Sequence, residues 1–427
     1  MSRYPKTLSV SPHSLLFMVI IIFFFFFEVN SRTHPSDILV LKVLKSSVDP
    51  SSIAPGSCLS SWDFSLDPCD SLFSDHFTCG FRCDRLVAGS LRVTEITLDP
   101  VGYTGSLASI SWNLPYLETL DISDNSFSGS IPGSLSNLTR LRLLSLSKNS
   151  FSAEVPLFLG LLSRLEELYL DNNHLNGPIP ASFDNMTSLK RLEIQQNGIS
   201  GELPNLGSLK NLYFLDASDN NISGGVPATL PPSLVELSIR NNNLRGNLPD
   251  DLNAMPLLQV LDLSHNKLSG TVSSVLFNHP SLQQLTLSRN YFNSLQVPGD
   301  GGASSRLIAL DLSYNDLRGF LPAFMASMPK LSALTLEHNK FTGMIPVQYA
   351  LRAAIPVNNI SPFERLLLGG NYLFGPIPDP LTGLKPGSVD VSLVDNCLSR
   401  CPDTFFFCQG RDQKSIMDCK SFAPVIP

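Results

Sequence analysis

The sequence lacks any long run of basic residues and is mildly acidic overall. Its 427 residues include 30 Lys and Arg against 37 Asp and Glu, for a formal net charge of -7. Nucleic-acid binding needs clustered Lys and Arg to neutralise phosphates, and electrostatic attachment to anionic lipid needs similar clusters. We therefore expect no nucleic-acid partner and no polybasic membrane anchor.

Motifs that carry catalysis are also missing. There is no glycine-rich phosphate loop and no H-R-D set, which excludes a kinase. Ser, His and Asp recur, but within a repeated spelling such as "LDLSHN", where His265 simply adjoins Ser264. Neighbours in sequence do not supply the converging side chains of a triad. We expect no enzymatic activity and no cofactor.

Long apolar runs are absent after the amino terminus. The exception is "LLFMVIIIFFFFF", thirteen apolar residues from Leu15 to Phe27 that follow two basic residues. This length fits the roughly 7–15-residue apolar region of a signal peptide, whereas a spanning helix needs about 20 residues. We predict a signal peptide over 1–31, cleaved after Ser31, with an uncleaved anchor as the alternative. The mature chain is then expected to have no spanning helix.

Cysteine is absent from the whole middle of the chain. The eight cysteines form two groups, Cys58, Cys69, Cys79, Cys83 and Cys397, Cys401, Cys408, Cys419. Even numbers in an exported chain predict disulfides, whereas a zinc site would favour short paired spacings with histidines. Because about 300 residues separate the groups, we expect bonds within each group and no metal site. Three pairings per group remain open.

What the chain has in abundance is one repeated spelling, L-x-x-L-x-L-x-x-N. Its asparagine falls at Asn125, Asn149, Asn173, Asn197, Asn220, Asn242, Asn266, Asn290, Asn315, Asn339, Asn371 and Asn396. The steps are 22 to 25 residues, except for one of 32. A degenerate unit over 93–101 comes first, with Val101 in the asparagine slot. About thirteen units of this period are typical of leucine-rich repeats.

Each part of the unit has a physical reason. Alternating leucines make a short strand with one apolar side, and parallel stacking of units buries these sides in one core. The asparagine amide can bond turn backbone that would otherwise be buried unpaired. The following "FSGSIP"-type segment predicts a bend at Gly and an extended stretch before Pro, possible as a second strand. A brief 3₁₀ or α turn should then cover the convex side.

These features predict an α/β repeat fold. It is a right-handed, curved leucine-rich-repeat solenoid with parallel strands on its concave face and disulfide-held caps at both ends. A terminal unit would otherwise expose its apolar face. We place the amino-terminal cap at 32–90, the repeats at 91–396 and the carboxyl-terminal cap at 397–427. The first cap should begin with an amphipathic helix whose N-cap is Ser36.

The L-x-G-x-I-P insert resembles the plant-specific leucine-rich repeat. The "LSSW" stretch and the D-P-C…C pattern that follows are similar to the amino-terminal cap of plant receptor-like kinases, receptor-like proteins and polygalacturonase-inhibiting proteins. The likeness covers nearly everything after residue 35. It differs from the kinases in having no kinase motifs, and from the polygalacturonase inhibitors in having more units.

The resemblance implies a secreted or cell-surface recognition protein in extracellular signalling or defence. Its partners would be a peptide or protein ligand, a receptor-like kinase co-receptor, or both. The expected location is the apoplast or cell wall, or the outer face of the plasma membrane. The alternative is an inhibitor of an extracellular cell-wall hydrolase such as polygalacturonase, which the lack of a basic surface for anionic pectin disfavours.

Concave positions that depart from the common spelling predict the ligand site. Four units carry Asp between two strand leucines and Ser two residues later, which we interpret as a solvated, locally hydrogen-bonded face; the residues are Asp121, Asp216, Asp262 and Asp311, with Ser123, Ser218, Ser264 and Ser313. The third to sixth units instead carry Tyr169, Arg191, Glu193, Tyr213, Phe214, Glu236 and Arg240. Aromatic residues and Arg anchor interfaces, and stacking should bring these side chains together. The alternative is that Tyr213 and Phe214 lean on neighbouring strands.

Two further features concern the outside of the arc. The 32-residue step contains "VQYALRAAIPVNNISPFE", which predicts either a binding loop or a longer convex helix. Glycosylation sequons lie at Asn137, Asn185, Asn221 and Asn359. Glycans at Asn137 and Asn185 would sit on the helical side and leave the inner face clear.

Overall fold

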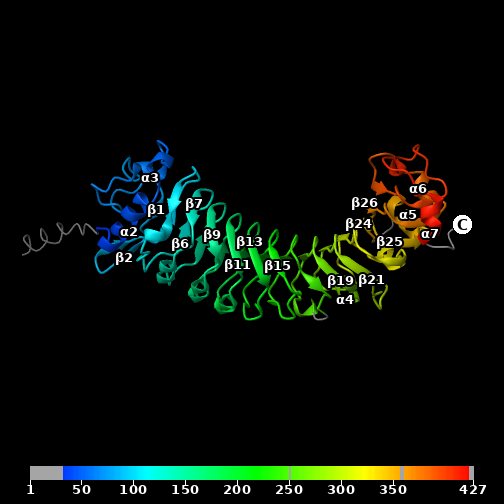
Figure 1. Ribbon diagram of the computed structural model, residues 1–427, viewed down its shortest axis with the longest axis horizontal. Helices are drawn as coiled ribbons and strands as arrows, with labels where there is room; N and C mark the ends of the chain where they lie inside the picture. Colours follow the sequence, from blue (N-terminus) through cyan, green and yellow to red (C-terminus); the bar gives the residue numbers. More distant parts are fainter. Residues whose placement is uncertain (1–31, 250–251, 356–359, 423–427) are drawn as a thin grey trace, which may run out of the picture.

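The computed structural model describes residues 32–249, 252–355 and 360–422. This part of the chain forms one long arc with a hollow upper side in the view of Figure 1. A continuous sheet of 14 strands runs along it, in the order β1-β4-β6-β8-β10-β12-β14-β16-β18-β20-β22-β24-β26-β28. Within it β1 (Phe81–Arg82) pairs antiparallel with β4 (Glu95–Thr97), and the other pairs are parallel. The predicted solenoid is confirmed.

The repeat strands of this sheet are three residues long, and their central residue is buried. After β4 they are β6 (Thr119–Asp121), β8 (Leu143–Ser145), β10 (Glu167–Tyr169), β12 (Arg191–Glu193), β14 (Phe214–Asp216), β16 (Glu236–Ser238), β18 (Val260–Asp262), β20 (Gln284–Thr286), β22 (Ala309–Asp311), β24 (Ala333–Thr335), β26 (Arg365–Leu367) and β28 (Asp390–Ser392). The leucines thus form one apolar core along the arc, as their alternation predicts.

A second, lateral layer of strands follows the asparagines, as the glycine-containing segment predicts. Its first sheet holds β5 (Thr104–Ser106), β7 (Ser126–Gly129), β9 (Ser150–Glu154), β11 (His174–Pro178), β13 (Gly198–Glu202) and β15 (Asn221–Ser223). Next come β17 (Arg245–Gly246), β19 (Lys267–Val272) and β21 (Tyr291–Leu295), then β23 (Arg318–Phe320), β25 (Lys340–Gly343), β27 (Tyr372–Gly375) and β29 (Cys397–Leu398). The lateral layer is therefore divided where the main sheet is continuous.

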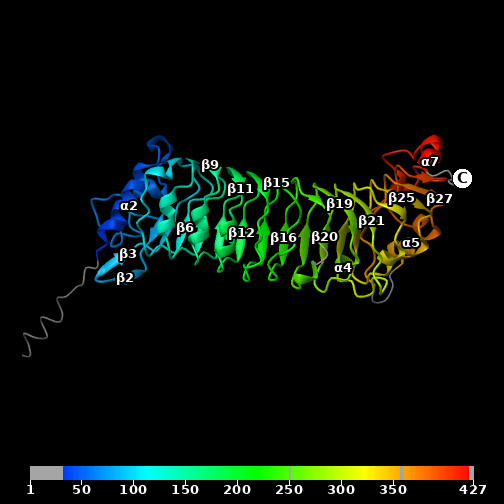
Figure 2. The same ribbon diagram turned by 60° about the horizontal axis from the view of Figure 1, so that its bottom comes forward.

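Short helical turns cover the convex side, which Figure 2 brings forward. They are η2 (Leu107–Ser109), η3 (Gly133–Asn137), η4 (Leu157–Leu161), η5 (Ala181–Asn185), η6 (Leu252–Ala254), α4 (Ser274–Phe277), η7 (Ala323–Ser327) and α6 (Asp379–Thr382). The 32-residue step forms the longer helix α5 (Val347–Ala354), which is the helical alternative predicted for it. Its buried Arg352 donates to the carbonyls of Met325, Ala326, Leu331 and Ser361.

Each repeat asparagine joins its own unit to the preceding one. Asn173 accepts the Phe151 N–H at 2.9 Å and donates to the Leu146 carbonyl at 2.9 Å, both in the preceding unit. It also donates to the carbonyls of Leu170 and Asp171 in its own unit. All twelve asparagines accept an N–H of the preceding unit in this way. The structural interpretation of this residue is confirmed.

The residue before each asparagine turns the chain out of the main sheet, and we call these residues the corner row. The row consists of Asp124, Lys148, Asn172, Gln196, Asp219, Asn241, His265, Arg289, Tyr314, His338, Gly370 and Asp395. Apart from Gly370, with φ of 70°, their φ angles lie between 50° and 57°. This is the left-handed region, which Asn, Asp and Gly adopt most easily.

The amino-terminal cap contains α2 (Pro35–Ser46), η1 (Pro50–Ser52), α3 (Cys58–Ser61) and the hairpin of β2 (Arg85–Val87) and β3 (Ser90–Arg92). Disulfides join Cys58 to Cys79 and Cys69 to Cys83. The prediction of Ser36 as N-cap is wrong. Because Pro35 is well suited to the first helical position, the helix begins there, and the His34 ring accepts the Ser36 N–H at 3.3 Å.

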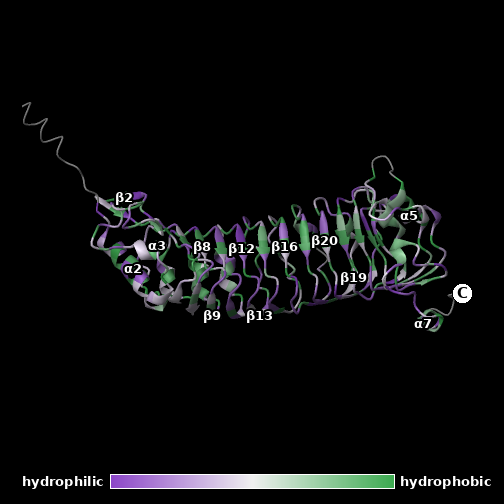
Figure 3. Cartoon of the chain, turned by 90° about the horizontal axis from the view of Figure 1, so that it is seen from above, coloured by the Kyte–Doolittle hydropathy of each residue, from purple (hydrophilic) through white to green (hydrophobic). Residues whose placement is uncertain are grey.

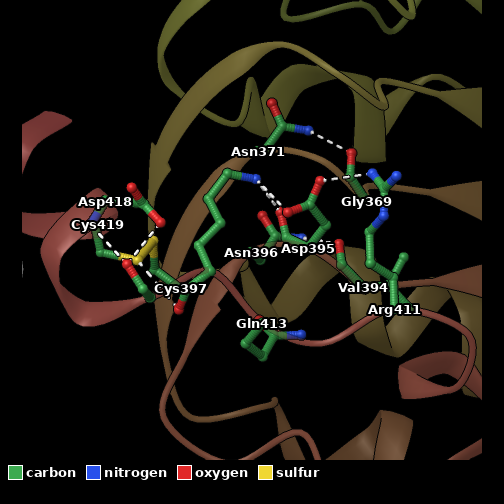
Figure 4. Close-up of polar contacts among 12 residues, drawn as sticks. Gly369, Asn371, Val394, Asp395, Asn396, Cys397, Arg411, Gln413, Asp418 and Cys419 are labelled. Atoms are coloured by element: carbon green, nitrogen blue, oxygen red, sulfur yellow. Dashed lines mark hydrogen bonds and ion pairs between the residues drawn. A yellow bond between two sulfur atoms is a disulfide. The ribbon is translucent and has the colours of Figure 1, made fainter.

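The carboxyl-terminal cap contains η8 (Phe406–Cys408) and α7 (Ile416–Phe422), with disulfides Cys397–Cys419 and Cys401–Cys408. Its Gln413 accepts the Leu398 N–H and donates to the Leu393 carbonyl, each at 3.1 Å. These are the two contacts that an asparagine of a following unit would make. Gln413 therefore ends the series of asparagine hydrogen bonds between units, which we call the asparagine ladder. Arg411 and Lys414 beside it pair with Asp395 (Figure 4).

The predicted signal peptide lies outside the described residues. Among the helices of the described part, none has the length and apolar character that crossing a membrane requires.

Candidate functional site

The floor of the hollow is built from the outer residues of the main-sheet strands. Figure 3 looks into the hollow and shows β8, β12, β16 and β20 side by side along the arc. Because the middle residue of each strand is buried, its two neighbours face the hollow. Strand register then decides which of these side chains meet.

The register brings five of the seven predicted ligand residues together, and we call the seven residues the concave patch. Arg191, Phe214 and Glu236 share the first position of β12, β14 and β16. Tyr169 and Glu193 share the third position of β10 and β12. The four strands are adjacent in the sheet, so these five residues form one surface.

An arginine stacked on an aromatic ring forms the centre of the concave patch. The Arg191 guanidinium lies 3.6 Å from the centroid of the Phe214 ring, and its Nε lies 2.6 Å from Glu193 Oε1. Phe214 is half-buried beneath this contact. It therefore leans on a neighbouring strand, as the alternative interpretation held, while it also fixes an arginine at the floor of the hollow.

The remaining members lie around this centre. The Tyr169 hydroxyl donates to Glu167 Oε2 at 2.5 Å, and burial, followed by this bond, raises the pKa of Tyr169. Tyr213 precedes β14 and is 42% exposed. Arg240 follows β16, outside the sheet, and pairs with Asp219 at 3.1 Å. Tyr213 and Arg240 thus lie at the margins of the concave patch.

Carboxylates outnumber cations on this surface. Glu167, Glu193, Asp216 and Glu236 face the guanidinium groups of Arg191 and Arg240. Burial raises the pKa of Asp216, and the charge of Glu193 adds to the effect. Burial and then the charge of Asp216 raise the pKa of Glu236. Together with the neighbouring Glu167 and Asp216, the concave patch therefore presents an acidic surface with an aromatic centre.

Sequence reasoning missed the extension of this surface toward the amino terminus. A pocket of about 450 Å³ within the hollow is lined by ten residues: Asp121, Ser123, Asp124, Leu143, Ser145, Ser147, Lys148, Tyr169, Asp171 and Glu193. Of these, Asp121 and Ser123 belong to the common Asp and Ser pattern, which we interpreted as a solvated face. The signal that could have found them is Tyr169, whose strand neighbour on the amino-terminal side is the small Ser145.

Three of the four sequons lie on exposed positions away from the hollow. Asn137 ends η3 and Asn185 ends η5, both on the convex side. Asn221 begins the lateral strand β15. Asn359 lies outside the described residues. In the described residues no group of three or more His, Cys, Asp or Glu could hold a metal ion.

Comparison with known proteins identifies the family. The family model described as a leucine-rich repeat region matches residues 91–352. The chain therefore belongs to the leucine-rich-repeat family. Over 56 residues it is 38% identical to the Arabidopsis thaliana protein STRUBBELIG-RECEPTOR FAMILY 1, which covers 13% of this chain and 7% of that protein.

Among solved structures, plant receptors are similar to this chain. The plant peptide hormone receptor RGFR1 in complex with RGF2 matches 71% of this chain and 48% of its own at 28% identity, with a TM-score of 0.65. A TDR receptor matches 71% and 52% at 28% identity, with a TM-score of 0.60. The chain thus spans about half the length of these receptor structures. A plant ice-binding protein, 21% identical with a TM-score of 0.52, matches 90% of this chain and 99% of its own and shares the fold alone.

Proposed function

We propose that the protein is an extracellular recognition protein that binds a peptide or protein ligand in its hollow, through the concave patch. The observation that supports this most is the Arg191–Phe214 stack on the floor of the hollow. Aromatic and arginine side chains are common anchors of interfaces. The similarity to a peptide hormone receptor in complex with its ligand agrees with this proposal.

The charge of the concave patch suggests the chemistry of the ligand. Four carboxylates surround the Arg191–Phe214 centre, and the neighbouring pocket adds Asp121, Asp124 and Asp171. A ligand with exposed Lys or Arg would complement this surface and be steered toward it. The proposed ligand is therefore a peptide or a protein segment with basic side chains.

An extracellular location and a signalling partner complete the proposal. Four disulfides favour an oxidising compartment, which agrees with a signal peptide over 1–31. The proposed mature protein then consists of caps at 32–90 and 397–427 and repeats at 91–396. A receptor-like kinase would be the partner that carries the signal into the cell. Glycans on the convex and lateral sequons would leave the hollow open.

The test is binding of the secreted, glycosylated protein to a partner captured from plant extracellular fluid or membranes. Phe214→Ala should weaken that binding by about tenfold or more, because hot-spot truncations cost roughly 2 kcal/mol. Phe320→Ala is the matched control, since Phe320 is 77% exposed on the lateral strand β23. Undiminished binding by Phe214→Ala would refute the proposed site, and inhibition of a polygalacturonase by the pure protein would favour the inhibitor alternative.

A further inference from the structure

A second surface with different chemistry lies farther along the arc, in the corner row. In the earlier units this row carries Asp, Asn, Lys or Gln, whereas four successive later units carry His265, Arg289, Tyr314 and His338. All four have φ angles between 51° and 54°. For bulky side chains this left-handed conformation is unfavourable, and such residues persist where something compensates for the cost.

Three of these residues form a continuous stack, which we call the stacked row: Arg289, Tyr314 and His338. The Arg289 guanidinium lies 4.1 Å from the centroid of the Tyr314 ring. The Tyr314 and His338 rings are stacked with centroids 4.2 Å apart and planes 23° apart. Gly370 comes next, where a Cβ would lie 2.5 Å from His338 Nδ1, so a residue without a side chain leaves the space that the histidine ring occupies.

The stack holds Arg289 in place without neutralising it. Arg191 and Arg240 each have a carboxylate partner, at 2.6 and 3.1 Å. Within the described part of the chain, no acidic group lies within ion-pair distance of the Arg289 side chain, and its guanidinium makes no hydrogen bond. Arg289 and Tyr314 are both exposed. An arginine held by stacking, with its donors unused, is pre-organised to bind a carboxylate in a forked geometry.

The surroundings favour an acidic partner that is a peptide. His265 precedes the stacked row, and beyond Gly370 the pairing of Asp395 with both Arg411 and Lys414 leaves one positive charge in excess. On the floor, Ala309 and Ala333 are aligned in β22 and β24, and Asp311 and Thr335 are aligned at the third position of these strands, nearer to the stacked row. The unpaired Arg289 and the excess positive charge beyond Gly370 suit an extended peptide in which carboxylates alternate with uncharged side chains.

We propose that the stacked row binds an acidic peptide segment of a partner protein, with Arg289 as the carboxylate ligand and Tyr314 as the residue that positions it. This surface is separate from the concave patch and has the opposite charge. Its occupant is therefore chemically distinct from the basic ligand of the proposed function.

The experiment uses the secreted, glycosylated protein and a fluorescent peptide in which Glu alternates with Leu. A length of roughly five residues covers the stacked row, because three units span about 15 Å and each extended residue about 3.3 Å. We expect saturable binding, measured by fluorescence anisotropy, and about tenfold weaker binding of the same peptide with Gln in place of Glu. Equal binding of the two peptides would overturn the proposal.

Asparagine variants separate binding from folding. Asn occupies the same corner in other units and adopts this backbone more easily, so Arg289→Asn and Tyr314→Asn should keep or raise the thermal stability and weaken Glu-peptide binding by about tenfold. Tyr314→Phe should bind normally, because the ring remains. Arg318→Asn, which removes an exposed arginine from the lateral strand β23, is the control for charge alone.

Three results would overturn the proposal. The first is loss of stability in both asparagine variants with unchanged binding, which would make the stack purely structural. The second is an equal loss of binding in Arg318→Asn, which would indicate unspecific attraction. The third is tighter binding of oligogalacturonate than of the peptide, which would make the occupant a wall polysaccharide. Phe214→Ala should leave peptide binding unchanged, so failure of the proposed function and failure of this inference are distinguishable.

Discussion

Single asparagines hold the interior of the solenoid together through polar contacts. Asn173 is 6% exposed and its amide bonds four backbone groups in two units. Backbone groups buried without partners are costly. The repeat asparagines therefore matter for stability through the groups they satisfy, whereas Arg191 and Phe214 face the hollow and contribute less to the core.

Asn173→Ala should lower the free energy of unfolding by about 2 kcal/mol, because it removes the acceptor of the buried Phe151 N–H and leaves the Leu146 carbonyl with Asn149 as its side-chain donor. Chemical denaturation followed by circular dichroism measures the change. Asn176→Ala is the control, since Asn176 is exposed on β11. Equal destabilisation by the two substitutions would show that the ladder contributes nothing special.

Asp216→Asn should stabilise the protein at neutral pH. Burial raises the pKa of Asp216 above its ordinary value of 3.8. Between 3.8 and the raised pKa, the folded chain therefore binds a proton at Asp216 more readily than the unfolded chain does. The contribution of this group to stability then falls as the pH rises through that window. The advantage of Asp216→Asn should accordingly disappear as the pH is lowered below about 3.8.

Asp121→Asn is the matched control for this titration. Asp121 accepts the Ser123 N–H much as Asp216 accepts the Ser218 N–H. Its strand neighbours are Thr97 and Ser145, whereas Asp216 lies beside Glu193. If both variants gained the same stability at neutral pH, the charge of Glu193 would not contribute to the raised pKa of Asp216.

At the level of elements, the sequence predicts what repeats and misses what occurs once. The leucines, asparagines and bends follow from patterns that recur in every unit, and all appear in the structure. The stacked row escaped notice because each residue fills an ordinary corner position, and only stacking of units shows that they touch. Ser36 was misplaced because its preference for the N-cap was weighed without the preference of Pro35 for the first helical position.

The end of the ladder was missed for a related reason. Gln413 lies in a segment without repeats, 17 positions after Asn396, so no spacing connects it to the asparagines. The missing asparagine of the first unit now has a physical explanation. No earlier unit precedes Val101, so an asparagine there would have no preceding backbone to satisfy.

Gln413→Ala should destabilise the carboxyl-terminal cap by about 1–3 kcal/mol, because the Leu398 N–H loses its acceptor and the Leu393 carbonyl keeps only Asn396 as a side-chain donor. Hydrogen exchange of the Leu398 N–H measures the effect. Gln409→Ala is the control, since Gln409 also donates to a carbonyl, that of Asp403, but lies exposed. If the two variants exchange alike, Gln413 does not terminate the ladder.

Across the whole molecule, local stability and surface charge vary along the length of the arc. Each unit contacts mainly its neighbours, so a disturbance at one end should decay along the arc. The concave patch is acidic and the stacked row carries unpaired positive charge, and they occupy different stretches of the same array. A partner with a basic and an acidic segment could span both.

Removing the Cys397–Cys419 disulfide by a double Ser substitution tests this one-dimensional behaviour. The loss should be about 2–5 kcal/mol, with faster hydrogen exchange confined to the last units. Removing Cys58–Cys79 should give the mirror image at the amino-terminal end. Uniform loss of protection along the arc in either variant would mean that the array unfolds as a single cooperative body.

The direction of the asparagine ladder has a consequence for synthesis. Each unit receives its final hydrogen bonds from the asparagine of the unit made after it. During translation the newest unit therefore lacks these bonds while the next unit is still inside the ribosome. The growing array therefore always has one unfinished rung at its leading edge, where an exposed apolar strand could pair wrongly. That vulnerable edge moves forward with every unit and closes only when Gln413 has emerged.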